Sequence, residues 1–261
     1  MNFLKFKDKT YFITGINNKK SVAYFCAKSI TDFGGKIITS VQNEKQVEFV
    51  KSKFPEATVY ICDVSDSKQI KELGNKVSKL DISLSGMLHS IAFAKFTSPS
   101  INEVPFEEFS EALKISAYSL VELSQALKDS FSNDACVVTV SISNLRATNY
   151  GYMGPIKSLL NSSIDYLAKE FSKFSNIRFN SVAAGPLKTS ASAGIPGYVE
   201  NYLYCEKLTL RKHGLKTSEV SNTVMFLLSN ASSGINAETI TVDAGMNVNY
   251  FDSDVVSPTQ P

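Results

Sequence analysis

Residues 10–23 read TYFITGINNKKSVA, and this stretch decides the fold. Residues 10–13 form a short run of aromatic and β-branched side chains that stops just before Gly15, which predicts a buried strand and a tight turn. From Ser21 onward, apolar residues recur at helical spacing until a glycine pair at 34–35 ends the helix. A strand, a turn and a helix in this order form the first unit of a parallel α/β sheet.

The same alternation continues along the chain. Further strands are expected at residues 36–41, 58–62, 85–91, 136–141, 177–183 and 239–243. Further helices are expected at residues 44–53, 106–128 and 150–173, and from about residue 217 to residue 228. The pattern predicts the α/β class: a single-domain, Rossmann-like, doubly wound parallel sheet of about seven strands with helices on both faces. In such sheets a ligand binds beyond the carboxyl ends of the strands, where the strand order reverses.

Length and composition fit one domain. The chain has 261 residues, of which 43% are hydrophobic and 20% charged, so it can bury a sizeable core. No linker-like stretch or repeat divides it. We therefore expect residues 1–251 to form one dinucleotide-binding and catalytic domain, and the polar, proline-containing residues 252–261 to be a disordered tail.

Charge and patterning exclude several classes of protein. A formal net charge of +2 with interspersed signs gives no basic footprint for nucleic acid. No stretch approaches the ~18–20 apolar residues of a membrane span, and the N-terminus lacks a signal peptide, so a cytoplasmic protein is expected. The four cysteines are scattered without ligand spacing, so no metal site or disulfide is expected. His89 lies inside an expected strand, which favours a structural role.

The turn after the first strand has part of the dinucleotide fingerprint. Of the glycines in G-x-G-x-x-G only Gly15 is present, and it allows a tight turn and close approach of backbone to phosphate. Ser21 can cap the following helix, whose free N–H groups and positive dipole end then face a pyrophosphate. Taken alone, this segment is also compatible with an ordinary strand-to-helix turn.

Several longer motifs carry a resemblance. TGI-x5-SVA at 14–23 resembles the nucleotide turn of the enoyl-acyl-carrier-protein reductases, short-chain dehydrogenase relatives that complete each cycle of fatty-acid elongation. QN at 42–43 and DV at 63–64 resemble that family's adenosine contacts, and HSIAFA at 89–94 its fourth-strand signature. The remaining matches are ISAYSL at 115–120, AGPLKT at 184–189, which resembles the segment that reaches the nicotinamide amide, and DAG at 243–245.

The resemblance implies a nicotinamide cofactor held by residues from many strand ends. The implied contacts are Gly15, Ser21, Val22, Gln42, Asp63, Val64, Ser90, Ile91, Ala92, Lys157, Gly185, Pro186, Leu187 and Thr189. NADP selection needs a cation for the 2′-phosphate, and the second strand exits into neutral residues 40–43. NADH is therefore favoured, and Lys45 keeps NADPH open.

The chemical centre is expected at residues 150–157. Ordinary short-chain dehydrogenases place tyrosine four residues before lysine, where this chain has Met153. Tyr150 instead precedes Lys157 by seven residues, close to two helical turns, so both project from one helix face. The resemblance implies that Tyr150 donates to the thioester carbonyl and that Lys157 holds the nicotinamide ribose. Tyr152 is the weaker alternative donor, and the simplest alternative makes all three ordinary helix residues.

The acyl substrate is expected beside this centre. The resemblance implies substrate contacts by Phe93, Ala94, Tyr150 and Met153, and a mobile loop near residues 188–204 that orders over bound ligand. The apolar residues in that stretch (Ile195, Tyr198, Tyr202 and Leu203) favour this function over an ordinary surface loop.

Two departures bear on activity. The family usually carries a second tyrosine just after the fifth strand, where this chain has Ile142, which cannot donate a proton. The following segment, residues 143–149, is also shorter than usual. Pro155 removes a backbone hydrogen bond, which is harmless only if the helix starts a residue or two earlier.

The sequence thus predicts an NADH-dependent oxidoreductase that reduces the 2,3 double bond of enoyl thioesters on acyl carrier protein. Two alternatives remain: a short-chain dehydrogenase acting on a carbonyl, which the residue at 153 disfavours, and a catalytically weak dinucleotide-binding homologue, which the residue at 142 favours. The resemblance also implies a homotetramer.

Overall fold

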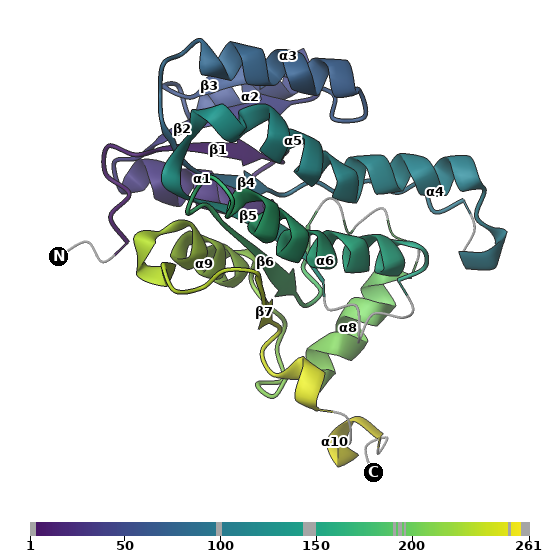
Figure 1. Cartoon of the computed structure of the whole chain (residues 1–261). Coiled ribbons are helices and arrows are strands. Elements are labelled where there is room, and N and C mark those ends of the chain that lie inside the picture. Colours follow the sequence, from purple (N-terminus) through teal and green to yellow (C-terminus); the bar gives the residue numbers. More distant parts are fainter. Residues whose placement is uncertain are drawn as a thin grey trace.

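Seven parallel strands form one sheet in the order β3-β2-β1-β4-β5-β6-β7 (Figure 1). The structure is a computed structural model that describes residues 4–97, 101–142, 150–189, 192, 195, 197–249 and 252–256. The strands are β1 (Thr10–Thr14), β2 (Lys36–Val41), β3 (Thr58–Ile61), β4 (Leu84–His89), β5 (Phe131–Ser141), β6 (Arg178–Ala184) and β7 (Glu238–Val242). The order reverses between β1 and β4, so the predicted doubly wound fold is confirmed.

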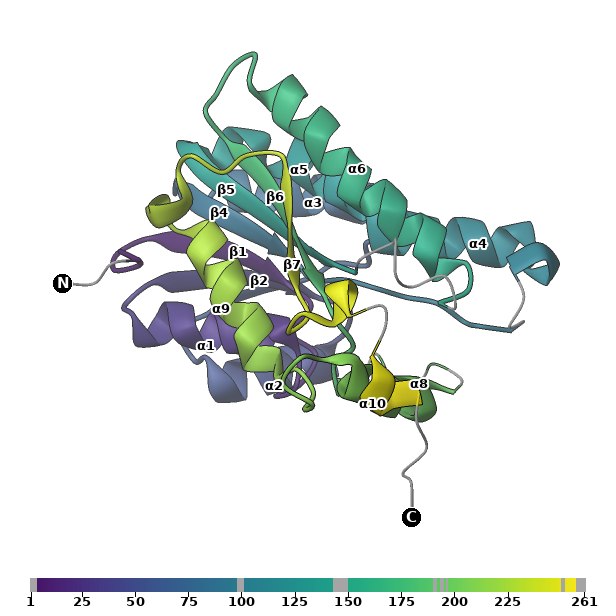
Figure 2. The same cartoon turned by 90° about the horizontal axis from the view of Figure 1, so that it is seen from below.

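Helices cover both faces of the sheet (Figure 1). One layer contains α1 (Val22–Asp32), α2 (Glu44–Lys53) and α9 (Thr217–Leu228). The other contains α3 (Ser67–Ser78), α4 (Phe106–Leu113), α5 (Ser119–Leu127) and α6 (Met153–Phe171). Helix α8 (Tyr198–Leu208) lies beyond one end of the sheet (Figure 2), and the single turn α10 (Ser253–Val256) lies farther out, near the C-terminus (Figure 1). Short 3₁₀ turns are η1 (Ile101–Glu103), η3 (Lys128–Ser130), η4 (Asn230–Ser232) and η5 (Met246–Val248).

The central strands are buried on both faces, which explains their unbroken apolar sequence. In β1, Tyr11 and Ile13 pack into the core beneath α1 and α9, while Phe12 packs into the core beneath α3 to α6. In β4, Met87 and Leu88 divide in the same way. All five side chains are fully buried. Side chains that alternate between two cores need no polar face.

Three helices differ from the sequence expectation. Helix α3 is not among the expected helices, although Asp66 caps it and its buried residues have helical spacing. The helix expected over 106–128 is interrupted by a π-helical segment, η2 (Lys114–Tyr118). Within η2 the Ser116 hydroxyl bonds to backbone of the segment after β4, which explains why the wider turn is stable there. The helix expected from residue 150 begins at Met153.

Gly151 accounts for the late start of α6. Its φ of +56° lies outside the right-handed helical region, so the helix begins after it. Pro155 consequently occupies the third position of α6, where a missing backbone N–H costs nothing.

The other sequence predictions concern the C-terminal third and the cysteines. Residues 198–208, in and just beyond the expected mobile loop, form helix α8. Among the described residues no helix has the length and apolarity needed to cross a membrane. Cys26, Cys62 and Cys136 are buried free thiols, and Cys205 is half-buried. The described part of the chain holds no cluster of side chains that could bind a metal ion.

Candidate active site

A cavity of about 720 Å³ lies at the carboxyl ends of the central strands. Its wall includes Gly15 after β1, Ser90 after β4, Ser141 at the end of β5 and Ala184 at the end of β6. We call it the main cavity. Its place at the reversal of strand order is where ligands of doubly wound sheets bind, and its volume is typical of a cofactor site.

Gly15 is required by a close approach of two strand ends. Its φ is +87°, and a Cβ there would lie 2.0 Å from the carbonyl oxygen of Ser90. The hydroxyl of Thr14 donates to the Leu88 carbonyl at 3.1 Å and accepts from the Ser90 N–H at 3.1 Å. The turn therefore joins β1 to β4, and the short distance to Ser90 leaves no room for a side chain at position 15.

Asn18 and Ser21 order the turn through local hydrogen bonds. Asn18 Oδ1 accepts from the Lys20 N–H at 2.8 Å, and the Ser21 hydroxyl donates to the Asn18 carbonyl at 3.0 Å. Ser21 Oγ also accepts from the Tyr24 N–H at 3.1 Å, so it caps α1 as the sequence predicted. Ser21 and Val22 line the main cavity, and the positive end of α1 therefore faces a site for an anionic group.

The end of β2 is tied to the same turn. The Gln42 N–H donates to Gln46 Oε1 at 2.7 Å, and Gln46 Nε2 donates to Asn17 Oδ1 at 3.1 Å. The Gln42 side chain is exposed, and Gln42, Asp63 and Val64 lie outside the wall of the main cavity. Their predicted adenosine contacts remain predictions.

Tyr150 and Lys157 both line the main cavity. Lys157 is only 4% exposed, and its ammonium donates to the Val140 carbonyl at 3.2 Å. Burial lowers the pKa of Lys157 to about 8. Burial, with a smaller contribution from the neighbouring Tyr198 phenol, raises the pKa of Tyr150 to about 12. At neutral pH the phenol keeps its proton and can donate a hydrogen bond into the cavity.

Tyr152, two residues further along, lies in the core. Its side chain is fully buried, and its hydroxyl donates to Glu108 Oε1 at 2.7 Å. The Tyr152 hydroxyl oxygen also accepts from the N–H groups of Lys95 at 3.0 Å and Phe96 at 3.3 Å. Tyr152 lies outside the wall of the main cavity, so the geometry does not support it as the alternative donor.

The segment after β6 supplies four further predicted residues to the cavity wall. Gly185, Pro186, Leu187 and Thr189 all line it. The Leu187 N–H donates to the Tyr198 hydroxyl at 2.9 Å, and this hydroxyl donates to the Leu187 carbonyl at 2.8 Å. The first turn of α8 is thereby bound to the backbone at the cavity.

Comparison with known proteins identifies the family. The family model described as Enoyl-(Acyl carrier protein) reductase matches residues 15–247. The chain belongs to this family.

The similarity extends over nearly the whole enoyl reductase chain. The NADH-dependent enoyl-[acyl-carrier-protein] reductase of Buchnera aphidicola (subspecies Schizaphis graminum) is 31% identical over 255 residues, covering 95% of this chain and 98% of the relative. The NADPH-dependent enzyme of Staphylococcus aureus is also 31% identical, covering 94% and 98%. The crystal structure of the NADH enzyme from Aquifex aeolicus superposes with a TM-score of 0.87 at 30% identity, covering 95% and 98%. The family predicted from the motifs is confirmed.

Ile142 contributes an apolar side chain to the wall of the main cavity. The backbone around Ile142 is well held: its carbonyl accepts from Asn161 Nδ2 at 3.2 Å, and Asn161 Oδ1 accepts from the Ser181 hydroxyl at 3.0 Å. The end of strand β5 is therefore fixed by side chains of α6 and β6.

Three predicted substrate residues lie just outside the cavity wall. The backbone N–H and carbonyl of Phe93 bond to the Ser116 hydroxyl at 2.8 and 3.1 Å. Ala94 packs against the core, and Met153 is 1% exposed within it. Their contact with substrate remains a prediction, whereas Ser90, Ile91 and Ala92 do line the cavity.

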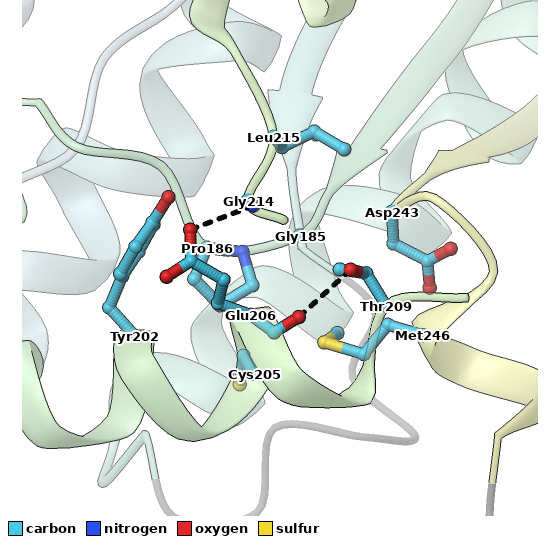
Figure 3. Close-up of a pocket in the computed structure, with 10 residues that line it drawn as sticks. All are labelled: Gly185, Pro186, Tyr202, Cys205, Glu206, Thr209, Gly214, Leu215, Asp243 and Met246. Atoms are coloured by element: carbon cyan, nitrogen blue, oxygen red, sulfur yellow. Dashed lines mark hydrogen bonds between the residues drawn. The ribbon is translucent and has the colours of Figure 1, made fainter. Parts of the chain in front are cut away.

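A second, small cavity lies beside the C-terminal half of α8 (Figure 3). Its volume is about 10 Å³, room for roughly one water molecule. Figure 3 shows Glu206 of α8 bonded to the loop beyond the helix, where its carboxylate accepts from the Gly214 N–H at 2.9 Å. The Glu206 carbonyl accepts from the Thr209 hydroxyl at 2.9 Å. The Glu206 carboxylate therefore links the C-terminal half of α8 to the loop at residue 214, whereas the Thr209 bond closes the end of the helix itself.

His89 is structural, as the sequence predicted. Its ring nitrogens lie 3.0 Å from the Thr139 hydroxyl and 2.9 Å from the Ser119 hydroxyl, and the side chain is fully buried. Burial, and then the nearby Lys157 charge, lowers its pKa to about 3, so the ring is neutral. A neutral imidazole with both ring nitrogens in hydrogen bonds does not carry protons at physiological pH.

Sequence reasoning missed several residues of the cavity wall: Asn17, Asn18, Asn201, Tyr204, Cys205 and Met246. Asn17 and Asn18 could have been found from the preference of asparagine for turns. Predictions about residues 143–149, parts of the expected loop at 190, 191, 193, 194 and 196, and residues 257–261 fall outside the described residues.

Proposed function

We propose that the chain reduces the 2,3 double bond of enoyl thioesters carried on acyl carrier protein, with NADH as hydride donor. The observation that carries the proposal is the meeting of Tyr150 and Lys157 with the Gly15 turn and the N-terminus of α1 in one cavity. That cavity combines an anion-binding helix end with a phenol donor and a buried cation.

NADH supplies a hydride to the β-carbon of the conjugated thioester, which leaves enolate charge on the thioester oxygen. The phenol of Tyr150 is suited to stabilise that charge. It is protonated at neutral pH and lies in a partly buried position, where a fixed hydrogen bond is worth more than in water.

Lys157 is suited to hold the cofactor and to favour the same charge. Its ammonium is buried and is bonded to the carbonyl of Val140, which leaves donor capacity for ribose hydroxyls. With a pKa of about 8 it is mainly cationic at neutral pH.

The neutral exit of β2 supports NADH over NADPH. Gln42 is uncharged and exposed, and Lys45 is the cation nearest to it in sequence. Parallel titrations with NADH and NADPH test this preference. Tighter binding of NADPH would contradict it.

The decisive assay incubates pure protein with NADH and a 2-enoyl thioester and follows the nicotinamide absorbance. Loss of absorbance that requires the enoyl substrate supports the proposal. NADH binding without turnover of any enoyl thioester would contradict it and support the catalytically weak homologue, which the residue at 142 favours. Turnover of a ketone instead would support a carbonyl reductase.

A homotetramer in the cytoplasm is part of the same proposal. Exposed apolar side chains are consistent with assembly: Tyr118 before α5 and Leu159 and Tyr166 on α6 are 49%, 43% and 73% exposed. Light scattering coupled to gel filtration tests the assembly, and cell fractionation tests the location.

A further inference from the structure

We infer that the Tyr198 hydroxyl occupies the binding position of the nicotinamide carboxamide when no cofactor is bound, and that NADH must displace it. The inference rests on the proposed use of a nicotinamide cofactor. It assigns to this tyrosine a function as an internal competitor at the cofactor end of the main cavity.

The contact has the hydrogen-bonding pattern of an amide. One residue, Leu187, presents both its N–H and its carbonyl to a single hydroxyl, at 2.9 and 2.8 Å. A primary carboxamide carries an acceptor and a donor side by side, so it can satisfy the same two backbone groups. The hydroxyl, which accepts from the N–H and donates to the carbonyl, imitates that pair.

The position is also where a nicotinamide ring must lie. Leu187 shares the wall of the main cavity with Tyr150 and Lys157, and hydride transfer needs the ring within reach of the substrate held there. The carboxamide is the hydrogen-bonding substituent of that ring. Tyr198 also lines the cavity, so its hydroxyl and the carboxamide would compete for the same two backbone groups of Leu187.

The two backbone groups of Leu187 depend on Tyr198 to different degrees. The carbonyl also lies within reach of the Ser192 hydroxyl at 2.7 Å and the Thr189 N–H at 3.0 Å. The N–H is bonded to the Tyr198 hydroxyl. Loss of Tyr198 therefore leaves the carbonyl with donors but deprives the N–H of its acceptor, which the carboxamide oxygen can replace.

Helix α8 can release Tyr198 without losing its place. Tyr198 is the first residue of α8, whereas the C-terminal half is bonded to other segments: the Glu206 carboxylate accepts from the Gly214 N–H (Figure 3), and the Leu208 carbonyl accepts from Asn249 Nδ2 at 2.9 Å. Gly197, with φ of +68°, immediately precedes the helix. A movement of the first turn is therefore compatible with an anchored helix end.

The test compares two ligands on two proteins. NADH carries the carboxamide, and ADP-ribose is the matched probe without nicotinamide. For Tyr198→Phe we expect the dissociation constant of NADH to fall roughly three- to tenfold, because one neutral hydrogen bond no longer competes. ADP-ribose should bind with unchanged affinity. Tyr204→Phe removes a hydroxyl from the same helix and cavity and should leave the ratio of the two constants as in the wild type.

Weaker NADH binding to Tyr198→Phe, or an equal change for both ligands, would show that the Tyr198 hydroxyl supports the structure of the site and does not compete with the carboxamide. Either result would overturn the inference. A crystal structure of the wild type with NADH tests it without a variant: Tyr198 Oη should lie beyond ~3.5 Å from both Leu187 atoms. A bond retained beside bound NADH would overturn it. Binding is measured without turnover, so an inactive protein that binds NADH refutes the proposed reaction alone. A wild type that binds no NADH refutes both.

Discussion

Tyr150 and Tyr152 are two residues apart and have opposite surroundings. Tyr150 lines the main cavity, where its phenol can meet a ligand, and Tyr152 is buried with three hydrogen-bond partners. Gly151, with its positive φ, lies between them. The difference teaches that neither residue type nor spacing to Lys157 assigns a catalytic function by itself. The position of the hydroxyl relative to the cavity does.

The largest effect should be on turnover, from a substitution of Tyr150, which lines the main cavity. Tyr150→Phe removes the donor to the developing enolate, so kcat should fall by about 10² to 10⁴ while NADH affinity and the melting temperature stay close to wild type. Steady-state kinetics, cofactor titration and a thermal melt measure the three quantities. Unchanged turnover would show that another group is the donor and would remove the contrast between the two tyrosines.

The next largest effect is the contribution of Lys157 to the pH dependence of the free energy of unfolding. Its pKa is about 8 in the folded chain and 10.5 in the unfolded reference, so between these values the unfolded chain holds the additional proton. The free energy of unfolding from this group therefore rises as pH increases from about 8 to 10.5, and the burial penalty is present in full below pH 8.

The measurement is the difference between wild type and Lys157→Met in denaturant titrations across that range, without cofactor. The wild type should gain on the order of 3 kcal/mol relative to the variant between the two limits. A difference that is flat with pH would mean that the buried ammonium is not destabilised in the folded chain.

Tyr152 should affect stability and leave the chemistry intact. Tyr152→Phe deprives Glu108 of a donor and the segment at 95–96 of an acceptor, so the free energy of unfolding should fall by about 1–3 kcal/mol. Turnover should stay within about threefold of wild type. Tyr166→Phe, at a site on α6 that is 73% exposed, is the matched control and should change neither quantity. A loss of kcat comparable to that of Tyr150→Phe would contradict the assignment of the two sides.

The sequence could predict the sheet, and the reason is local. Strands buried on both faces are continuous apolar runs, and Gly15 and Ser21 mark a turn whose geometry depends on neighbours in the chain. Helix α8 could also be predicted from the sequence, because Tyr198, Tyr202 and Cys205 repeat at helical spacing. The expectation of a mobile loop considers only the apolar character of the first two and not this spacing.

Contacts between distant segments could not be predicted in that way. Tyr152 meets Glu108 across 44 positions, and nothing near either residue indicates the other. The bond from Tyr198 to Leu187 spans only 11 positions, but it depends on where α8 packs relative to the end of β6. Motifs place residues at a strand end, and tertiary packing decides which of them reach the cavity.

The smallest effect sharpens the comparison by adding a third phenol. Ile142 lies in the wall of the same cavity as Tyr150, on a strand end fixed by Asn161, so Ile142→Tyr can place a hydroxyl beside the reacting oxygen. One additional neutral hydrogen bond should raise kcat/KM roughly two- to tenfold. Ile142→Phe supplies the ring without the hydroxyl and should leave kcat/KM near wild type. An equal gain from both variants would attribute the effect to packing, and a loss from tyrosine alone would mean that this reductase has adapted its site to an apolar residue there.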